Sequence, residues 1–158
     1  MIYCALVFAT ALSNDSIADV LAKPRHRAVL TKLGNEVGAV AKANGVTPEG
    51  FDGYDPGAFA PGASLDAQTK SFEDMVAHNR RSTKSHSGIW RDLAVRKRKT
   101  EVDALITPIV EIGTVRGLTM PIAARVVEMI HEIEAGARSL DDENLVELAL
   151  GQPETAGG

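Results

Sequence analysis

The chain has 158 residues and a formal net charge of −4, and 44% of its residues are hydrophobic, 24% charged and 4% aromatic. This length suits a single domain, and the apolar content excludes an intrinsically disordered chain. A single cysteine excludes an intrachain disulfide framework. No apolar run approaches the roughly 18 residues of a membrane span. We therefore expect a reduced, cytoplasmic protein that binds neither membrane nor nucleic acid.

The spacing of apolar residues predicts helices from the start of the chain. Residues 1–12 are apolar on almost all sides, which is typical of a covered helix, and they lack the basic start of a signal peptide. A short helical turn over 17–21 follows. Pro24 then opens a strongly amphipathic helix over 26–44, with Gly45 as its left-handed cap.

The rest of the chain also has helical spacing, interrupted by one long segment rich in proline and glycine. The expected elements are a surface loop over 46–64, a helix over 65–84, and a polar break over 82–88 that leads into residues 89–93. A helix from 102 follows, kinked at Pro108 and ended by Gly117. The last two are a long helix from Pro121 capped by Thr119, and an acidic helix reaching Leu150 with Ser139 and Asp142 as its capping pair. No segment alternates with period two. We predict an all-α domain of about six helices.

Several common catalytic and binding motifs are absent from the sequence. Neither glycine-rich phosphate-binding string occurs, and the four histidines lack metal-ligand spacing, so no metal site is expected. Cys4 lies in the apolar first helix, which favours a buried, inert thiol over a nucleophile. Gly34 and Gly38, inside a helix, indicate a closely packed neighbour.

Positive charge is concentrated in twenty positions, where only Asp92 opposes it. Eight of the 17 basic residues lie there: Arg80, Arg81, Lys84, Arg91, Arg96, Lys97, Arg98 and Lys99. Such a cluster indicates either an anion-facing surface or a solvated helix face. Glu101 follows it and opens an apolar helix, where a carboxylate is favoured by the helix dipole, so Glu101 is either a simple cap or a site residue.

This part of the chain resembles the C-terminal helical domain of ketopantoate reductases (2-dehydropantoate 2-reductases). The similar features are a serine-containing segment ending in aspartate (87–92), the string R-K-T-E-V-D (98–103), Gly117 with Pro121, and Glu134 with Gly136. The resemblance covers about residues 17–138. It divides the chain into a reductase-like domain over 1–138 and a short acidic helix with a frayed tail over 139–158.

The resemblance implies a fold similar to the C-terminal domain of 6-phosphogluconate dehydrogenase. In the family, this domain follows a Rossmann domain that holds NADPH, and the pair reduces the small 2-keto acid ketopantoate on the route to pantothenate. A homodimer is also implied. Because the Rossmann domain is absent from these 158 residues, we expect it upstream, and we expect the chain alone to bind NADP(H) weakly or not at all and to be inactive.

The resemblance also assigns roles to individual residues. Glu101 matches the glutamate that contacts the nicotinamide ribose. Ser87, or Gly88 beside it, matches the substrate-binding serine, and Asn14 matches a substrate-binding asparagine. Arg98 matches an arginine that pairs with a neighbouring acid.

The chain departs from the family pattern at the catalytic positions. The lysine that supplies the proton has no counterpart, since no lysine occurs before Lys23. Tyr3, Ala5 and Val7 occupy the region of two substrate-binding asparagines. The asparagine–glycine pair that often follows the T-E-[IV]-D motif is replaced by residues 106–107. The catalytic residue therefore stays unassigned.

Two other functions compete with this interpretation. The chain could be a non-enzymatic interaction module in which the first and last helices serve self-association. A weaker hypothesis is nucleic-acid binding through the basic cluster, which would show a steep dependence on salt.

Overall fold

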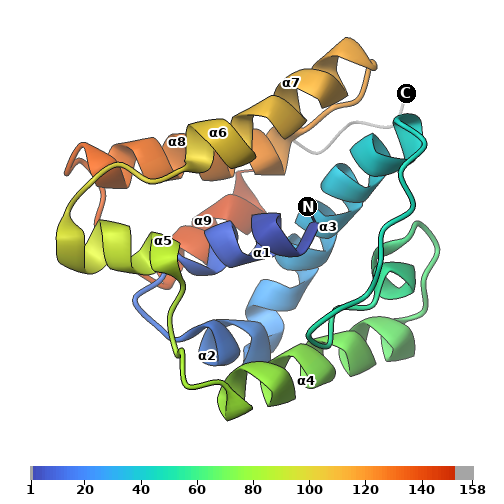
Figure 1. Cartoon of the computed structure of the whole chain (residues 1–158), viewed down its shortest axis with the longest axis horizontal. Helices are drawn as coiled ribbons and strands as arrows, with labels where there is room; N and C mark the ends of the chain where they lie inside the picture. The colour runs from blue at the N-terminus through green and yellow to red at the C-terminus, as the bar shows by residue number, and fades with distance from the viewer. Residues whose placement is uncertain (1, 152–158) are drawn as a thin grey trace.

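The computed structural model describes residues 2–151 and contains no strand within that range (Figure 1). The all-α expectation is confirmed, but these residues form nine α-helices, not about six. They are α1 (Ile2–Thr10), α2 (Ile17–Ala22), α3 (Pro24–Ala43), α4 (Leu65–Arg81), α5 (Gly88–Arg91), α6 (Val102–Leu105), α7 (Thr107–Val115), α8 (Pro121–Glu134) and α9 (Glu143–Leu150). Every one of them is too short or too polar to cross a membrane.

The helix count is higher for two reasons. One expected helix is interrupted and counts as two, and α5 is an additional short helix. The helix expected from residue 102 is divided at Ile106 into α6 and α7, instead of bending at Pro108. Pro108 lies in the first turn of α7, where its missing N–H costs nothing, so the interruption falls before the proline. After the predicted polar break, the chain forms α5 and then a π-helical turn over Asp92–Arg96.

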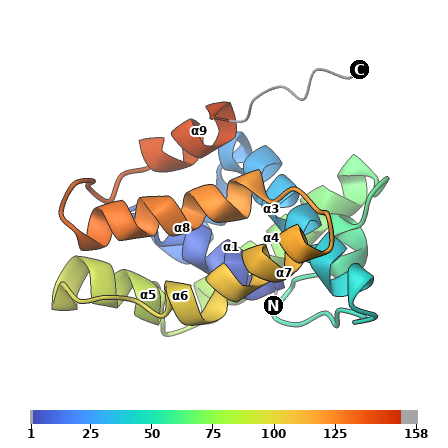
Figure 2. The same ribbon diagram turned by 90° about the horizontal axis from the view of Figure 1, so that it is seen from above.

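Helix α1 lies in the interior of the domain, between α8 on one side and α2 on the other (Figure 1). Leu6, Phe8 and Ala9 are each no more than 1% exposed. This agrees with the expectation that the apolar first helix is covered on most sides. Seen from above, α8 runs between α9 and the α6–α7 segment (Figure 2). These helices cover α1 and complete the core.

The expected loop over 46–64 packs closely against α3 at Gly34. A Cβ atom on Gly34 would lie 2.6 Å from Cδ1 of Phe59, which is closer than side chains approach one another. Phe59 ends a short 3₁₀ helix over Pro56–Phe59 and is 2% exposed. The prediction of close packing is therefore confirmed at Gly34. At Gly38, by contrast, the nearest atom, of Ile2, would lie at an ordinary 3.5 Å.

The cap predicted for α8 is wrong. The helix begins after Met120, and no side chain of the preceding loop caps it, including Thr119. Instead, the Glu36 carboxylate of α3 accepts hydrogen bonds from the backbone N–H groups of Ile122 (3.0 Å) and Ala123 (2.9 Å). Burial raises the pKa of Glu36. A distant helix supplies the cap because α3 and α8 pack against each other.

The capping pair predicted for α9 is also wrong. Asp142 precedes α9 without a side-chain cap and forms ion pairs with Lys23 and Arg25. Asn144 joins α9 to the core by donating to the carbonyl oxygens of Leu12 and Ser139, both at 2.9 Å. Two leucines of α9 are buried in the common core, so this helix is packed into the domain. Residues 152–158 of the predicted tail lie outside the described residues.

Candidate functional site

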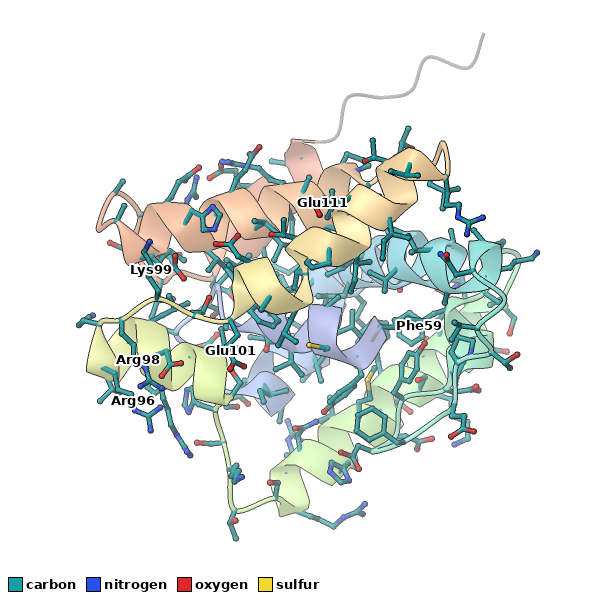
Figure 3. The ribbon with its side chains drawn as sticks, turned by 45° about the horizontal axis from the view of Figure 1, so that its top comes forward. Phe59, Arg96, Arg98, Lys99, Glu101 and Glu111 are labelled. Carbon is teal, nitrogen blue, oxygen red and sulfur yellow. The ribbon has the colours of Figure 1, made fainter. Side chains whose placement is uncertain are left out.

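A hollow of about 610 Å³ opens between α1, α5 and the segment that leads into α6. It is lined by Val7, Ser87, Gly88, Ile89, Asp92, Arg96, Arg98, Lys99 and Glu101. The structure thus brings together Ser87, Gly88 and Glu101, three residues that the sequence indicated as site candidates. Figure 3 shows Arg96, Arg98, Lys99 and Glu101 gathered on this side of the domain.

Ser87 is oriented by the start of α5. Its Oγ accepts a hydrogen bond from the backbone N–H of Trp90 at 3.0 Å, which makes it the N-cap of the helix. The hydroxyl hydrogen stays free to donate to a ligand, since the cap uses only an acceptor lone pair. A Cβ atom on Gly88 would meet no atom within 4 Å. The edge of the hollow beside Ser87 is therefore open.

Asp92 organises the basic side of the hollow. Its Oδ1 accepts hydrogen bonds from Nη1 of Arg96 and Nε of Arg98, both at 2.8 Å. This confirms the expected pairing of Arg98 with an acid. The hydrogen bond from Arg96, followed by that from Arg98, lowers the pKa of Asp92, so Asp92 stays ionised at neutral pH.

The backbone of this segment has an unusual conformation. The π-helical turn over Asp92–Arg96 ends at Lys97, a non-glycine residue in the left-handed region with a φ of 51°. The backbone N–H of Arg98 then donates to the carbonyl oxygen of Asp92 at 3.0 Å. π-turns and left-handed non-glycine residues are infrequent and concentrate at functional sites. Here they place Arg96 and Arg98 on the same carboxylate.

Glu134 of α8 holds the chain where it enters α6. Its Oε1 accepts hydrogen bonds from the backbone N–H of Thr100 at 2.7 Å and from its hydroxyl at 2.9 Å. The Thr100 hydroxyl in turn accepts from the backbone N–H of Val102 at 3.2 Å. These bonds fix the residues on both sides of Glu101. The sequence indicated Glu134 through the family motif, but its contact with Thr100 depends on helix packing.

The Glu101 carboxylate is exposed at the start of α6 and does not cap it. Within residues 2–151, it makes no hydrogen bond and no ion pair. It is therefore free to accept hydrogen bonds from the hydroxyl groups of a ligand. Cys4, on α1, is half-buried and not fully buried as expected, and burial raises the pKa of its thiol, which disfavours the thiolate form.

Asn14 lies outside this hollow. It lines a second hollow of about 580 Å³, together with Lys97, Ser139 and the end of α8. Arg98 is the residue common to the two hollows. Val7, from the region where the resemblance places two asparagines, lines the first hollow and contributes an apolar side chain to it. The sequence showed that Val7 stands in the region of these asparagines, but it did not show that Val7 lines the hollow.

The histidines form no cluster that resembles a metal centre. His26 is fully buried, with its Nδ1 3.3 Å from the carbonyl oxygen of Val20, and burial lowers its pKa. His131 lies 2.9 Å from a carboxylate oxygen of Asp103. Over the described range 2–151, no three histidine, cysteine, aspartate or glutamate residues are placed to hold a metal ion.

The fold and the hollow define an all-helical domain with an open, mixed-charge hollow on one side. The family model described as Ketopantoate reductase PanE/ApbA C terminal matches residues 1–134. The chain belongs to this family of ketopantoate reductase C-terminal domains. No significant match was found among curated proteins or among solved structures. The matched range includes every residue that lines the hollow.

Proposed function

We propose that this domain forms the substrate-facing wall of an NADPH-dependent reductase for a small 2-keto acid, with ketopantoate as the substrate. The observation that carries the proposal is the hollow in which Ser87, Gly88 and Glu101 meet, although separate segments supply them. Membership of the ketopantoate reductase family gives the reaction class. A Rossmann domain, outside these 158 residues, holds most of the cofactor.

The residues of the hollow suit the substrate end of such a reaction. Reduction of a 2-keto acid needs donors that hold the carboxylate and fix the carbonyl in position. Ser87 supplies a free hydroxyl hydrogen, and Lys99 adds positive charge to the rim. The open edge at Gly88 leaves room for the substrate, while Val7 and Ile89 provide an apolar surface for its carbon chain.

Glu101 suits the ribose of a nicotinamide cofactor. Its carboxylate is exposed and has no partner within the described residues, so it can accept hydrogen bonds from two neighbouring hydroxyl groups. Glu134 and Thr100 fix the backbone beside it. The cofactor supplies the hydride when it is bound. In this proposal, Glu101 orients the ribose at the mouth of the hollow.

The isolated chain lacks two requirements of the reaction. It has neither a glycine-rich dinucleotide-binding string nor a lysine before Lys23 to supply the proton. We therefore expect the purified 158-residue protein to give no ketopantoate-dependent oxidation of NADPH, measured by the absorbance of the reduced nicotinamide. Turnover above the protein-free background would contradict this part of the proposal.

Ligand binding to the hollow is tested by NMR titration of the ¹⁵N-labelled chain, first with ketopantoate and then with NADPH. We expect weak, saturable shifts in the amides of Ser87 and Gly88 with the keto acid, and in those of Thr100 and Glu101 with the nucleotide. Glu101→Gln should remove the nucleotide response and keep the keto acid response. The matched control, Glu73→Gln on the exposed face of α4, should change neither.

The titration contradicts the proposal if the shifts map to another surface, or if Glu101→Gln responds to NADPH like the wild type. The alternative, a self-association module, loses its first helix as a contact surface, because α1 is packed into the core. It keeps one favourable observation, a group of exposed apolar side chains on α7.

A further inference from the structure

A pocket of about 310 Å³ lies where the start of α1 meets the end of α3 and the loop over 46–64. This loop runs between the ends of α3 and α4 along one side of the domain (Figure 1). Three aromatic residues, Tyr3, Phe51 and Tyr54, line the pocket, and none of its lining residues also lines the candidate reductase hollow. The volume suits a small ligand. The proposed reductase function therefore gives this pocket no role.

The three aromatic rings are inclined to one another and do not stack face to face. The ring centroids of Tyr3 and Phe51 lie 4.7 Å apart, with an angle of 72° between the ring planes. Those of Tyr3 and Tyr54 lie 6.5 Å apart at an angle of 51°. Phe51 is 52% exposed although it is large and apolar, so part of its ring is uncovered. The face of an aromatic ring attracts a cation that lies within about 6 Å of the ring centroid.

The turn that carries Phe51 and Tyr54 is firmly held. The N–H of Phe51 donates to the carbonyl oxygen of Tyr54 at 3.2 Å, and the reverse hydrogen bond measures 2.8 Å. Paired residues of an antiparallel bridge direct their side chains to the same side. Gly53, with a φ of 87°, packs so closely on α4 that a Cβ atom there would lie 2.4 Å from the carbonyl carbon of Asp74. The two rings are therefore in place before a ligand binds, which lowers the cost of binding.

The hydroxyl group of Tyr54 is a buried donor without a partner. Tyr54 is 4% exposed, and within residues 2–151 its hydroxyl oxygen takes part in no hydrogen bond. Burial, with a smaller contribution from Asp55, raises the pKa of Tyr54 to about 12, so the hydroxyl keeps its proton at neutral pH. Buried hydroxyl groups normally have a partner, because an unmade hydrogen bond is costly. A ligand with an acceptor atom would supply the missing partner.

The only charged side chain among the described residues that line the pocket is negative. This residue, Glu49, is exposed and forms no ion pair within the described range. Two further carboxylates adjoin the aromatic residues of the turn, since Asp52 follows Phe51 and Asp55 follows Tyr54. A positively charged ligand is therefore favoured over an anionic one.

We propose that this pocket binds an alkylated ammonium group that carries a hydrogen-bond acceptor close to its charge. The aromatic faces contact the cation, Tyr54 donates to the acceptor, and Glu49 provides the counter-charge at the rim. A fully alkylated ammonium group has no N–H to donate, so ring faces suit it better than a carbonyl or carboxylate cradle. This inference does not rest on the proposed reductase function, because it uses none of the residues of the hollow.

NMR titration of the ¹⁵N-labelled full chain tests the proposal with two ligands of nearly the same shape. Choline carries a quaternary ammonium group and a hydroxyl oxygen, and 3,3-dimethyl-1-butanol replaces the charged nitrogen with carbon. We expect choline to give saturable shifts in the amides of Tyr3, Phe51 and Tyr54. The neutral alcohol should bind at least about tenfold more weakly, because it lacks the cation–π attraction. Equal binding of the two ligands would overturn the proposal, since the pocket would then be merely apolar.

Two substitutions separate the ring faces from the hydroxyl group. Phe51→Leu keeps an apolar side chain without the ring and should weaken choline binding by about fivefold. Tyr54→Phe keeps the ring and should weaken choline binding by about threefold, but it should not change the binding of tetramethylammonium, which has no acceptor atom. Leu65→Ala, at an exposed position on α4 outside the pocket, is the matched control and should bind choline like the wild type.

The proposal is overturned if choline gives no saturable shifts at these amides, or if Phe51→Leu binds choline like the wild type. If Tyr54→Phe weakens choline and tetramethylammonium equally, the role given to the hydroxyl group is wrong. Circular dichroism shows whether each variant is folded. Because Phe51 is half exposed, its replacement by leucine should leave the fold intact.

Discussion

Helix α1 and the segment over residues 87–101 are adjacent in the fold, but they are organised in different ways. α1 is held by apolar packing on nearly every side. The segment over 87–101 is largely exposed and is held by a few hydrogen bonds to Asp92 and Glu134. Val7 of α1 lines the hollow and so connects the two regions. The comparison separates the residues that stabilise the fold from those that we propose to bind a ligand.

The largest effect is expected from Phe8→Ala in α1. Phe8 is fully buried, and removing its ring leaves a cavity in the core. We expect the free energy of unfolding to fall by about 3–5 kcal/mol in urea denaturation. Val95→Ala, at a position in the segment that is 66% exposed, serves as the control and should change it by less than about 0.5 kcal/mol. If the two variants lost similar amounts of unfolding free energy, α1 and the segment over 87–101 would contribute equally to stability, contrary to the comparison.

A smaller, pH-dependent effect is expected from Asp92→Asn. The pKa of Asp92 is lowered in the folded state by Arg96 and Arg98, so its contribution to stability is present above the ordinary carboxyl pKa and is lost as the pH falls through the folded value. Because both arginines are largely exposed, we expect a loss of about 1 kcal/mol at neutral pH. Urea denaturation at several pH values should show this loss shrinking below about pH 4. A loss that does not depend on pH would mean that the ion pairs contribute nothing.

The smallest effect on stability is expected from Gly88→Ala, at the edge of the hollow. The added methyl group meets no neighbour, and the lower entropy of the unfolded chain should raise stability by about 0.5 kcal/mol. The same methyl group narrows the open edge of the hollow, so the NMR response to ketopantoate should weaken. A strongly destabilised variant would show that the space beside Gly88 is not free.

Much of the fold could be predicted because local chemistry determines it. The prolines at positions 24 and 121 each open a helix where a missing N–H costs nothing, and Gly45 and Gly117 take the left-handed conformation expected at helix ends. The apolar spacing of α3 gave its buried face. The caps of α8 and α9 were predicted incorrectly, because their actual contacts come from residues distant in sequence, such as Glu36.

The candidate site was predictable only in part. The family motif indicated Ser87, Gly88 and Glu101, and the structure brings them to one hollow. Asn14 does not lie there, because the segment after α1 places it in the lining of the second hollow. The π-helical turn at Asp92 could not be predicted, because no local residue pattern distinguishes it from an α-helix. Its two arginine contacts follow from that turn.

The contact between Gly34 and Phe59 has a consequence for variation in this family. Any larger side chain at position 34 would displace the Phe59 ring. It would also displace the 3₁₀ helix that Phe59 ends, within the loop over 46–64. The two positions should vary together, so that a sequence with alanine or serine at 34 carries a smaller residue at 59.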